Sequence, residues 1–406
     1  MTAHKLLITN HQSLITDFLV VGAGIIGLSI ARELSKKYSD SKIIVIEKES
    51  NVALHSSGRN SGVLHAGFYY TSDSLKAKFT RDGNKLLTDY CLQNELSINR
   101  CGKVVVAKDE HELKTIYELD KRGKANGVDV RIIDEKELSE LEPNAKTFGK
   151  ALYSPTTSSV DPKLVCRHIA DSLKGNAQVL YDTFFIKRGG KDSIVTNNGK
   201  IKFKHLINTA GLYADKIAHQ FGVGKKYTLI PFKGLYVKYN DDKLLRMHVY
   251  PVPNLKNPFL GVHYTKKFDG TVKVGPTSMP AFWRENYKLT EKFKCNEFVE
   301  VAFYESLMFM MKNDFRSLAF DEIKKYSKSY MVSQAFYMTK KVDPNNFGKY
   351  LEPGIRAQLV DKKSLELVMD FVVEHAENST HVLNAVSPAF TAAPSFGKWV
   401  VEGVKE

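Results

Sequence analysis

The chain has 406 residues, of which 43% are hydrophobic and 26% are charged. These proportions are typical of a globular protein and exclude a disordered chain, a collagen-like chain and a protein with many membrane spans. The formal net charge of +14 indicates an anionic partner, such as nucleic acid, a membrane surface or a small acidic molecule. Lysine far outnumbers arginine and no basic stripe with interleaved aromatic residues is present, so we expect no nucleic-acid partner.

The cysteines and the N-terminal sequence indicate the cellular compartment of the protein. Cys91, Cys101, Cys166 and Cys295 form no CxxC pair, so we expect reduced, mostly buried thiols and neither a disulfide framework nor a bound metal. The first 18 residues lack the apolar core of a signal peptide and the arginine-rich helix of a transit peptide. No apolar run reaches the ~18 residues of a transmembrane helix. These features predict a cytoplasmic protein.

The chain opens with a β–α–β unit. Residues 17–21 predict a buried strand, residues 28–37 a helix and residues 42–47 a second strand parallel to the first. Further helices are predicted over residues 74–96, 109–123, 162–173 and 212–221, and again within 290–340 and at the C-terminus. Further strands are predicted over residues 103–107, 178–180, 184–187, 193–196, 202–203, 205–208, 359–369 and 381–386. Between residues 229 and 275, alternating aromatic-rich runs predict an antiparallel sheet.

The order of these elements predicts two interleaved domains of mixed α/β and α+β class. Parallel α/β signals recur in three separated stretches, so we expect a discontinuous Rossmann-like dinucleotide-binding domain of residues 1–85, 150–222 and 345–406. The intervening residues 86–149 and 223–344 are expected to form a substrate-binding domain on a mixed or antiparallel sheet.

Gly22, Gly24 and Gly27 form a GxGxxG motif between the first strand and helix. The first glycine permits a tight turn, the second permits close approach of a pyrophosphate, and the third permits the helix to pack on the strand. Glu47 ends the second strand, 20 residues after Gly27, where an acid binds a ribose hydroxyl. This acid favours FAD or NAD over NADP.

Three later segments favour FAD over NAD. Residues 55–70 form a long glycine- and serine-rich loop directly after the second strand, as expected where a flavin ring lies against backbone. NTAG at 208–211 and SPAFT at 387–391 place free backbone N–H groups at strand-to-helix turns, where anionic groups bind. A helix N-terminus near the flavin would also stabilise its anionic reduced form.

Together, GAGIIG with Glu47, SGRNSGVLHAGFYY, NTAG and GIRAQ resemble the FAD oxidoreductases of the D-amino-acid-oxidase type. The long serine–glycine string, PFKGLY, YPVP and FLGVHYT resemble the L-2-hydroxyglutarate dehydrogenases and oxidases within that type, over about residues 17–400. The resemblance implies an FAD site formed by Gly22, Gly24, Ile25, Gly27, Glu47, Lys48, Ser57, Arg59, Asn60, Ser61, Gly62, Val63, Phe185, Ala210, Gly211, Gly354, Arg356, Pro388, Ala389, Phe390 and Thr391.

The resemblance also implies oxidation of a small anionic 2-hydroxy dicarboxylate, L-2-hydroxyglutarate to 2-oxoglutarate, with hydride transfer to flavin N5. Such a site needs a base and cationic carboxylate anchors. We expect His263 to be the base and His65 to contact the flavin, with the reverse assignment left open. Candidate anchors are Arg59, Lys233, Tyr264 and Arg356. The sequence departs from the family pattern at Lys233, where arginine is expected, and at Phe390 and Pro394.

The sequence leaves three alternatives open. The chain could be an amine or amino-acid oxidase of the glycine or sarcosine type, a flavoprotein without turnover that serves in assembly, or an NAD-dependent dehydrogenase. The electron acceptor is either oxygen or a quinone. A quinone would require peripheral contact with the inner face of a membrane.

Overall fold

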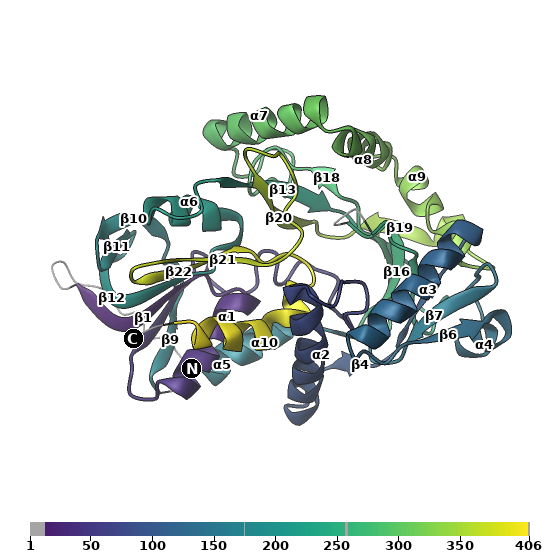
Figure 1. Ribbon diagram of the computed structural model, residues 1–406, viewed down its shortest axis with the longest axis horizontal. Coiled ribbons are helices and arrows are strands. Elements are labelled where there is room, and N and C mark those ends of the chain that lie inside the picture. Colours follow the sequence, from purple (N-terminus) through teal and green to yellow (C-terminus); the bar gives the residue numbers. More distant parts are fainter. Residues whose placement is uncertain (1–12, 174, 256–258, 405–406) are drawn as a thin grey trace.

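The computed structural model describes residues 13–173, 175–255 and 259–404. The prediction that no targeting segment opens the chain rests largely on residues 1–12, which lie outside the described residues. Two large sheets stand side by side in Figure 1, joined by two small sheets and by helices that pack around them. Among the described residues, no helix combines the length and apolar character needed to cross a membrane.

The first large sheet contains the predicted β–α–β unit. Its strands run in the order β10-β11-β12-β1-β2-β9, with β22 beside β12 and β21 beside β22. The pairs among β12, β1, β2, β9 and β22 are parallel, whereas β10, β11 and β21 pair antiparallel at the edges. These strands are β1 (Leu14–Val21), β2 (Ile43–Ile46), β9 (Ala177–Leu180), β10 (Phe185–Gly190), β11 (Ser193–Thr196), β12 (Gly199–Asn208), β21 (Val372–Ala376) and β22 (Ser379–Asn384).

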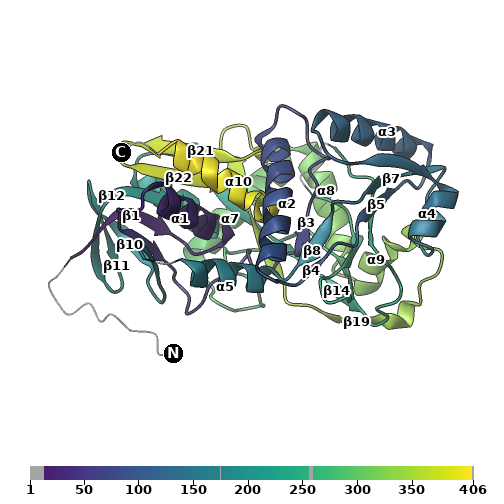
Figure 2. The same ribbon diagram turned by 90° about the horizontal axis from the view of Figure 1, so that it is seen from below.

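Helices cover both faces of this sheet. On one face α1 (Ile25–Lys37), α10 (Ala389–Glu402) and α2 (Leu75–Gln93) pack together, as Figure 2 shows, with α5 (Pro162–Ser172) beside α1. Their apolar side chains form one core with β1 and β2. On the other face α6 (Ala214–Gln220) packs on β12 and β22. Burial of both faces is characteristic of a parallel sheet.

The second large sheet has the order β19-β14-β17-β16-β15-β5-β7-β6. Its pairs are antiparallel except β15 with β5, which is parallel, so the sheet is mixed, one of the two forms expected, and the pairs within residues 229–275 are antiparallel. The strands are β5 (Lys103–Val106), β6 (Arg131–Asp134), β7 (Lys150–Ser154), β14 (Val237–Tyr239), β15 (His248–Pro251), β16 (His263–Lys266), β17 (Val272–Gly275) and β19 (Phe347–Tyr350). Helices α3 (Glu110–Ala125), α4 (Glu135–Leu141) and α9 (Lys328–Ser333) pack against it.

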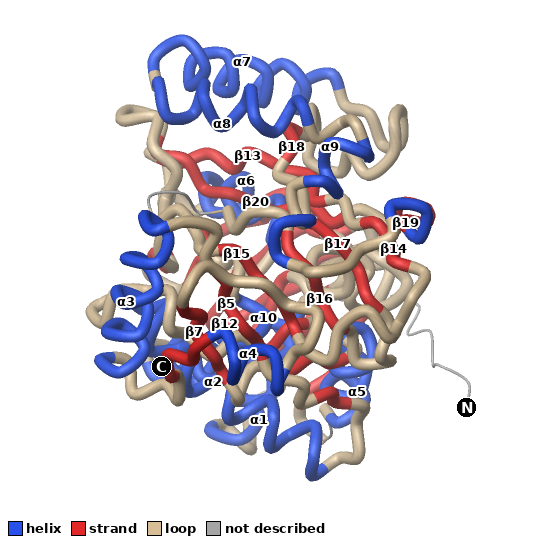
Figure 3. The backbone as a smooth tube through the Cα atoms, turned by 90° about the vertical axis from the view of Figure 1, so that its right-hand side faces the viewer, coloured by secondary structure: helices blue, strands red, loops and turns tan. Residues whose placement is uncertain are grey.

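Two small sheets connect these halves. One has the order β18-β13-β20, from β13 (Tyr227–Gly234), β18 (Met279–Pro280) and β20 (Gly354–Asp361). The other has the order β3-β8-β4, from β3 (Val63–Leu64), β4 (Ile98–Asn99) and β8 (Ser158–Val160). Helices α7 (Cys295–Met311) and α8 (Asn313–Lys324) lie outside the first of them, at the top of Figures 1 and 3.

Some predicted elements have different bounds. Residues 202–203 and 205–208 belong to one strand, β12, because alternating burial continues through Lys204 between them. The strand expected over 359–369 begins at Gly354 and ends at Asp361, whose carboxylate accepts the N–H groups of Lys363 and Ser364 and forms a turn. The helix expected over 212–221 starts as a 3-10 turn, Gly211–Tyr213, before α6.

The expected division into two domains stays a prediction. Sheet pairing bears on it at two points. The strands β7 and β19 lie in ranges assigned to the dinucleotide-binding domain, yet both pair within the second large sheet. Both strands lie at the start of their assigned ranges, so sheet pairing places the two crossings a few residues later, after Ser154 and after Tyr350.

Candidate active site

A cavity of about 1090 Å³ lies between the two halves of the molecule. Its walls come from the carboxyl ends of β1 and β2, the loop before β3, the turn after β12, strand β20 and the start of α10. In an open α/β sheet, ligands bind at the carboxyl ends of parallel strands, where this cavity lies. The volume is at the upper end for ligand pockets and suits a dinucleotide together with a small substrate.

The glycine motif forms one end of the cavity. Gly22 has a φ of +101°, and a Cβ there would lie 2.8 Å from the carbonyl oxygen of Thr209. A Cβ at Gly27 would lie 2.0 Å from the carbonyl oxygen of Gly22, so only glycine lets α1 approach the turn. Gly24 is the N-cap of α1, and the Ser57 hydroxyl accepts the N–H of Ile25 at 3.0 Å. The turn that leads into α1 thus presents Gly22 and Gly24 to the cavity, with no side chain at either position.

Glu47 lines the cavity directly after β2. Its carboxylate accepts the N–H groups of Ala23 at 2.9 Å and Glu49 at 3.1 Å, so it braces the glycine turn from the neighbouring strand. Burial raises the pKa of this carboxyl, while the two N–H groups oppose that rise.

The serine–glycine loop is held in place by its own polar side chains. Asn60 donates to the carbonyl oxygens of Ser56 and Ser57 and accepts the N–H of Gly62. Arg59 donates to the carbonyl oxygen of Leu54 and pairs with Glu352 at 3.0 Å. Arg59 therefore joins this loop to the start of β20, and its guanidinium is engaged before any substrate arrives.

Two histidines face the part of the cavity near β3 and β16. His263 lines the cavity from β16, and its Nδ1 lies 2.7 Å from the carbonyl oxygen of Gly261. His65 follows β3, and its backbone N–H donates to the Thr391 hydroxyl at the start of α10. Burial lowers the pKa of His263 to about 3 and holds that of His65 well below its usual value, so both imidazoles are neutral near pH 7.

Arg356 reaches the same region from β20. Its guanidinium carbon lies 4.8 Å from the centroid of the Phe259 ring. Burial lowers its pKa, whereas the nearby hydroxyl groups of Tyr70 and Tyr236 act in the opposite direction. Since arginine keeps its charge in proteins, this is a cation in a largely apolar part of the cavity.

Lys233 and Tyr264 are not among the residues that line the cavity. Successive residues of a strand point to opposite faces, so His263 faces the cavity and Tyr264 packs into the core of the second sheet. By the same alternation Phe232 and Gly234 line the cavity, and Lys233 instead bonds to Asn286 at 3.3 Å. The anchoring roles expected for both residues find no support in this geometry.

The other residues expected to bind the cofactor also fall into two groups, those that line the cavity and those that do not. Gly27 and Gly62 are not lining residues, and both are glycines that neighbouring backbone approaches closely. The cavity is lined by the remaining ones, namely Gly22, Gly24, Ile25, Glu47, Lys48, Ser57, Arg59, Asn60, Ser61, Val63, Phe185, Ala210, Gly211, Gly354, Arg356, Pro388, Ala389, Phe390 and Thr391.

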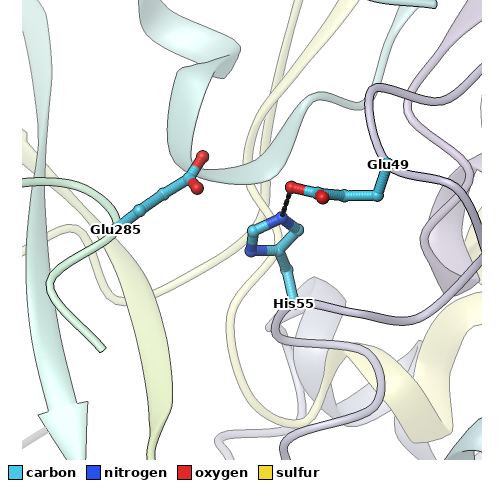
Figure 4. Close-up of side chains that lie close together, drawn as sticks. All are labelled: Glu49, His55 and Glu285. Carbon is cyan, nitrogen blue, oxygen red and sulfur yellow. Dashed lines mark hydrogen bonds and ion pairs between the residues drawn. The ribbon is translucent and has the colours of Figure 1, made fainter. Parts of the chain in front are cut away.

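A cluster of charged residues closes another part of the cavity wall. Ligand atoms of Glu49, His55 and Glu285 lie within 4.8 Å of one another, and Figure 4 shows His55 bonded to Glu49. Lys292 lies 3.0 Å from Glu49 and 2.8 Å from Glu285, and Lys48 also pairs with Glu285. The two carboxylates are therefore already compensated by lysines, and these side chains form an ion-pair network.

Several lining residues were missed by sequence reasoning. Tyr250 stacks on His263 with ring centroids 3.7 Å apart, and Phe259 lies beside Arg356. Tyr250 is the tyrosine of YPVP, and Phe259 belongs to the FLGVHYT run, so both lie within motifs that carry the family resemblance. Glu285 and Lys292 lie in a segment without a recognisable motif, and no sequence signal pointed to them.

A doubly covered parallel sheet, a glycine turn at a helix N-terminus and a large cavity beside them define a dinucleotide-dependent oxidoreductase fold. The family model for FAD-dependent oxidoreductases (DAO) matches residues 17–403, and the chain belongs to this family. It is 33% identical to an L-2-hydroxyglutarate dehydrogenase of Escherichia coli, over 96% of this chain and 93% of that protein.

Solved structures agree on the fold. An L-alpha-glycerophosphate oxidase from Mycoplasma pneumoniae with FAD bound superposes with a TM-score of 0.73 at 24% identity, covering 96% of this chain and 95% of that one. A glycine oxidase from Geobacillus kaustophilus superposes with a TM-score of 0.67 at 16% identity, covering 97% and 96% of the two chains.

The cavity fits the cofactor of this family. The glycine turn leaves room for a pyrophosphate at the N-terminus of α1, and Glu47 lies beside it for a ribose. The N-terminus of α10 also opens on the cavity. As an FAD-dependent oxidoreductase, the protein passes electrons from its substrate to an acceptor.

Proposed function

We propose that this protein oxidises L-2-hydroxyglutarate to 2-oxoglutarate. The observation that carries the proposal is the placement of a neutral imidazole, His263, and a buried guanidinium, Arg356, in one cavity beside the start of α10. When bound, FAD supplies the two-electron acceptor that takes the C2 hydrogen as hydride. The name of the relative that matches 96% of the chain adds support for this substrate.

His263 is the proposed base for the substrate hydroxyl proton. Its Nδ1–H donates to the Gly261 carbonyl oxygen, which leaves the lone pair on Nε2. A pKa of about 3 makes the imidazole a weak base in the empty site. The two negative charges of a bound dicarboxylate would raise that pKa, because an opposite charge nearby favours the imidazolium. The base is then strengthened by the substrate itself.

Arg356 is the proposed anchor for a substrate carboxylate. A guanidinium binds a carboxylate through two parallel hydrogen bonds, and these are stronger where water is excluded. The packing of Arg356 on Phe259 fixes the plane of the guanidinium. His65 is proposed to contact the flavin, since the bonds from its backbone N–H to Thr391 and from Asn84 to its carbonyl oxygen fix it beside α10.

An anaerobic titration of the purified yellow protein tests this function. L-2-hydroxyglutarate should bleach the flavin absorbance with an equivalent yield of 2-oxoglutarate, and its D-enantiomer should not. Bleaching by glycine or sarcosine in place of L-2-hydroxyglutarate would reject the proposal in favour of an amine oxidase. Bound FAD that none of these four compounds reduces would point to a flavoprotein without turnover.

For the electron acceptor, we propose a membrane quinone rather than oxygen. The exposed residues of α7 include Val299, Phe303, Met310 and Met311 and carry no charge, since the helix's three glutamates are buried or half-buried. An apolar surface of this kind often marks an interaction site. The inner side of α7 packs on Phe232 and Phe259, and both of these line the cavity.

Vesicles of phosphatidylethanolamine and phosphatidylglycerol test this contact. The protein should sediment with them, and the substitution Phe303→Ser combined with Met311→Ser should reduce that binding. A soluble ubiquinone analogue should reoxidise the reduced flavin much faster than air-saturated buffer. Rapid reoxidation by oxygen without vesicle binding would instead identify an oxidase.

A further inference from the structure

Lys103, the first residue of β5, is fully buried, yet its ammonium nitrogen has no hydrogen-bond partner among the described residues. The nitrogen lies over three aromatic rings, 4.7 Å from the centroids of Phe68 and Tyr69 and 4.9 Å from that of Tyr250. A buried charge is ordinarily paired with a counterion, because desolvation is costly. Here the negative faces of three rings take that place.

The register of the second sheet places Lys103 on the face that carries the candidate base. Lys103 lies opposite His248 in the parallel β5–β15 pair. His248 and Tyr250 are two residues apart on β15 and so share a face. The β15–β16 pair places Val249 opposite Tyr264, which puts His263 next to Tyr250. The rings of Tyr250 and His263 then stack with an interplanar angle of 22°.

The two charged groups that act on His263, Lys103 and Lys273, both favour its neutral form. Lys103 and Lys273 each act by like charge on a histidine that would become positive, and burial acts in the same direction. Only the Gly261 carbonyl, which accepts the Nδ1–H, acts in the opposite direction. Lys103 also lowers the pKa of His65 and His248, so one cation acts on three imidazoles.

We propose that Lys103 is a positioning residue whose ammonium holds the Tyr250 ring against His263 and keeps the His263 imidazole neutral until substrate binds. The proposal rests on the proposed function only in naming His263 as the base. Burial lowers the pKa of Lys103 to about 7, whereas the three ring faces favour the ammonium. No carboxylate among the described residues hydrogen-bonds to this ammonium. A dicarboxylate bound near His263 would therefore supply the negative charge that compensates it.

An NMR titration of the FAD-bound protein tests this role without turnover. The protein is labelled at histidine, and the His263 signal is assigned by its loss in His263→Gln. Wild-type His263 should remain neutral from pH 8 to 4.5. Lys103→Met should raise the pKa of His263 by about one unit, which increases the imidazolium fraction at pH 4.5 by about eightfold. Lys103→Arg, which keeps the charge, should behave like the wild type.

Lys273→Met is the matched control, because Lys273 is also a buried lysine with a pKa of about 7, 4.3 Å from the Tyr236 ring. It should shift His263 less than Lys103→Met and leave His65 unchanged. In stopped-flow flavin reduction, Lys103→Met should move the acidic limb of the pH profile to higher pH, and Lys103→Arg should restore its position.

An unchanged His263 pKa in Lys103→Met would overturn the proposal. If Lys103→Met lost FAD, the wild-type titration would still test the proposal. A His263 that is half-protonated near pH 6.5 in the wild type would overturn it. A chain not reduced by L-2-hydroxyglutarate would contradict the proposed function alone, since the titration needs no substrate.

Discussion

The Nδ1 atom of His263 lies 2.7 Å from the carbonyl oxygen of Gly261, two residues earlier in the chain. A carbonyl can only accept, so Nδ1 carries the proton and Nε2 is the basic atom of the neutral ring. This contact orients the imidazole from the segment just before β16, independently of the cofactor.

Replacing His263 with glutamine should therefore remove the base while keeping a polar side chain of similar reach. General-base catalysis contributes about 10²–10⁴-fold, and we expect flavin reduction by L-2-hydroxyglutarate to slow by that factor. Stopped-flow measurement of the reduction rate at saturating substrate checks this. The same substitution at His65 is the comparison. A larger loss at His65 than at His263 would reverse the assignment of base and flavin contact.

Removal of the Arg356 charge should weaken substrate binding. Hydrogen bonds to charged groups contribute about 1.5–3 kcal/mol, so Arg356→Met should raise the substrate Kd by roughly 10- to 150-fold. Arg356→Lys should recover only part of the affinity, since an ammonium lacks the planar fork. Spectral titration with 2-oxoglutarate, which binds without turnover, measures the Kd directly. An unchanged Kd in Arg356→Met would exclude the anchoring role.

Local sequence signals predicted the parts of the site that depend on a few neighbouring residues. The GxGxxG turn and Glu47 lie where their spacing placed them, and Asp161 caps α5 by accepting the N–H groups of Lys163 and Leu164. Each of these arrangements is set within one strand-to-helix connection or one β–α–β unit, where propensity, sterics and motif spacing decide the outcome.

The rest of the site depends on pairing between distant strands. The Tyr250–His263 stack and the burial of Lys103 follow from the register of β15 with β16 and β5, which no single segment encodes. Strand alternation alone, however, would have excluded one of His263 and Tyr264 from the cavity, because neighbouring residues on a strand face opposite sides. This signal was present in the sequence.

The ion-pair network around Glu285 should make the protein sensitive to acid. Although burial opposes it, pairing with Lys48 and Lys292 lowers the pKa of Glu285 from 4.5 to about 2. A carboxyl whose pKa is lower in the folded state stabilises the fold above pH 4.5, and this stabilisation is lost as the pH falls toward 2. Thermal unfolding of the wild type and Glu285→Gln should therefore differ most above pH 5 and converge toward pH 2.5. A constant difference in Tm across this range would contradict the prediction.

The ion pair between Arg284 and Asp215 should matter far more to stability than any exposed pair. Its two hydrogen bonds are 2.7 and 2.8 Å long, and the two side chains are 1% and 0% exposed. Asp215 belongs to α6 and also accepts the N–H of Leu229 at the start of β13, so the pair joins the first sheet to the small sheet. Arg284→Met leaves a buried, uncompensated carboxylate, which costs about 3–5 kcal/mol.

Urea unfolding followed by tryptophan fluorescence should show this loss as a lower free energy of unfolding. Lys191→Met is the control, because the Lys191–Glu377 pair is largely exposed and contributes about 0–1 kcal/mol. The double substitution of Arg284→Met with Asp215→Leu should recover part of the stability, since it removes the stranded charge together with its partner. If the two single variants, Arg284→Met and Lys191→Met, had the same urea midpoint of unfolding, the buried pair would not stabilise the contact between α6 and the small sheet over the cavity.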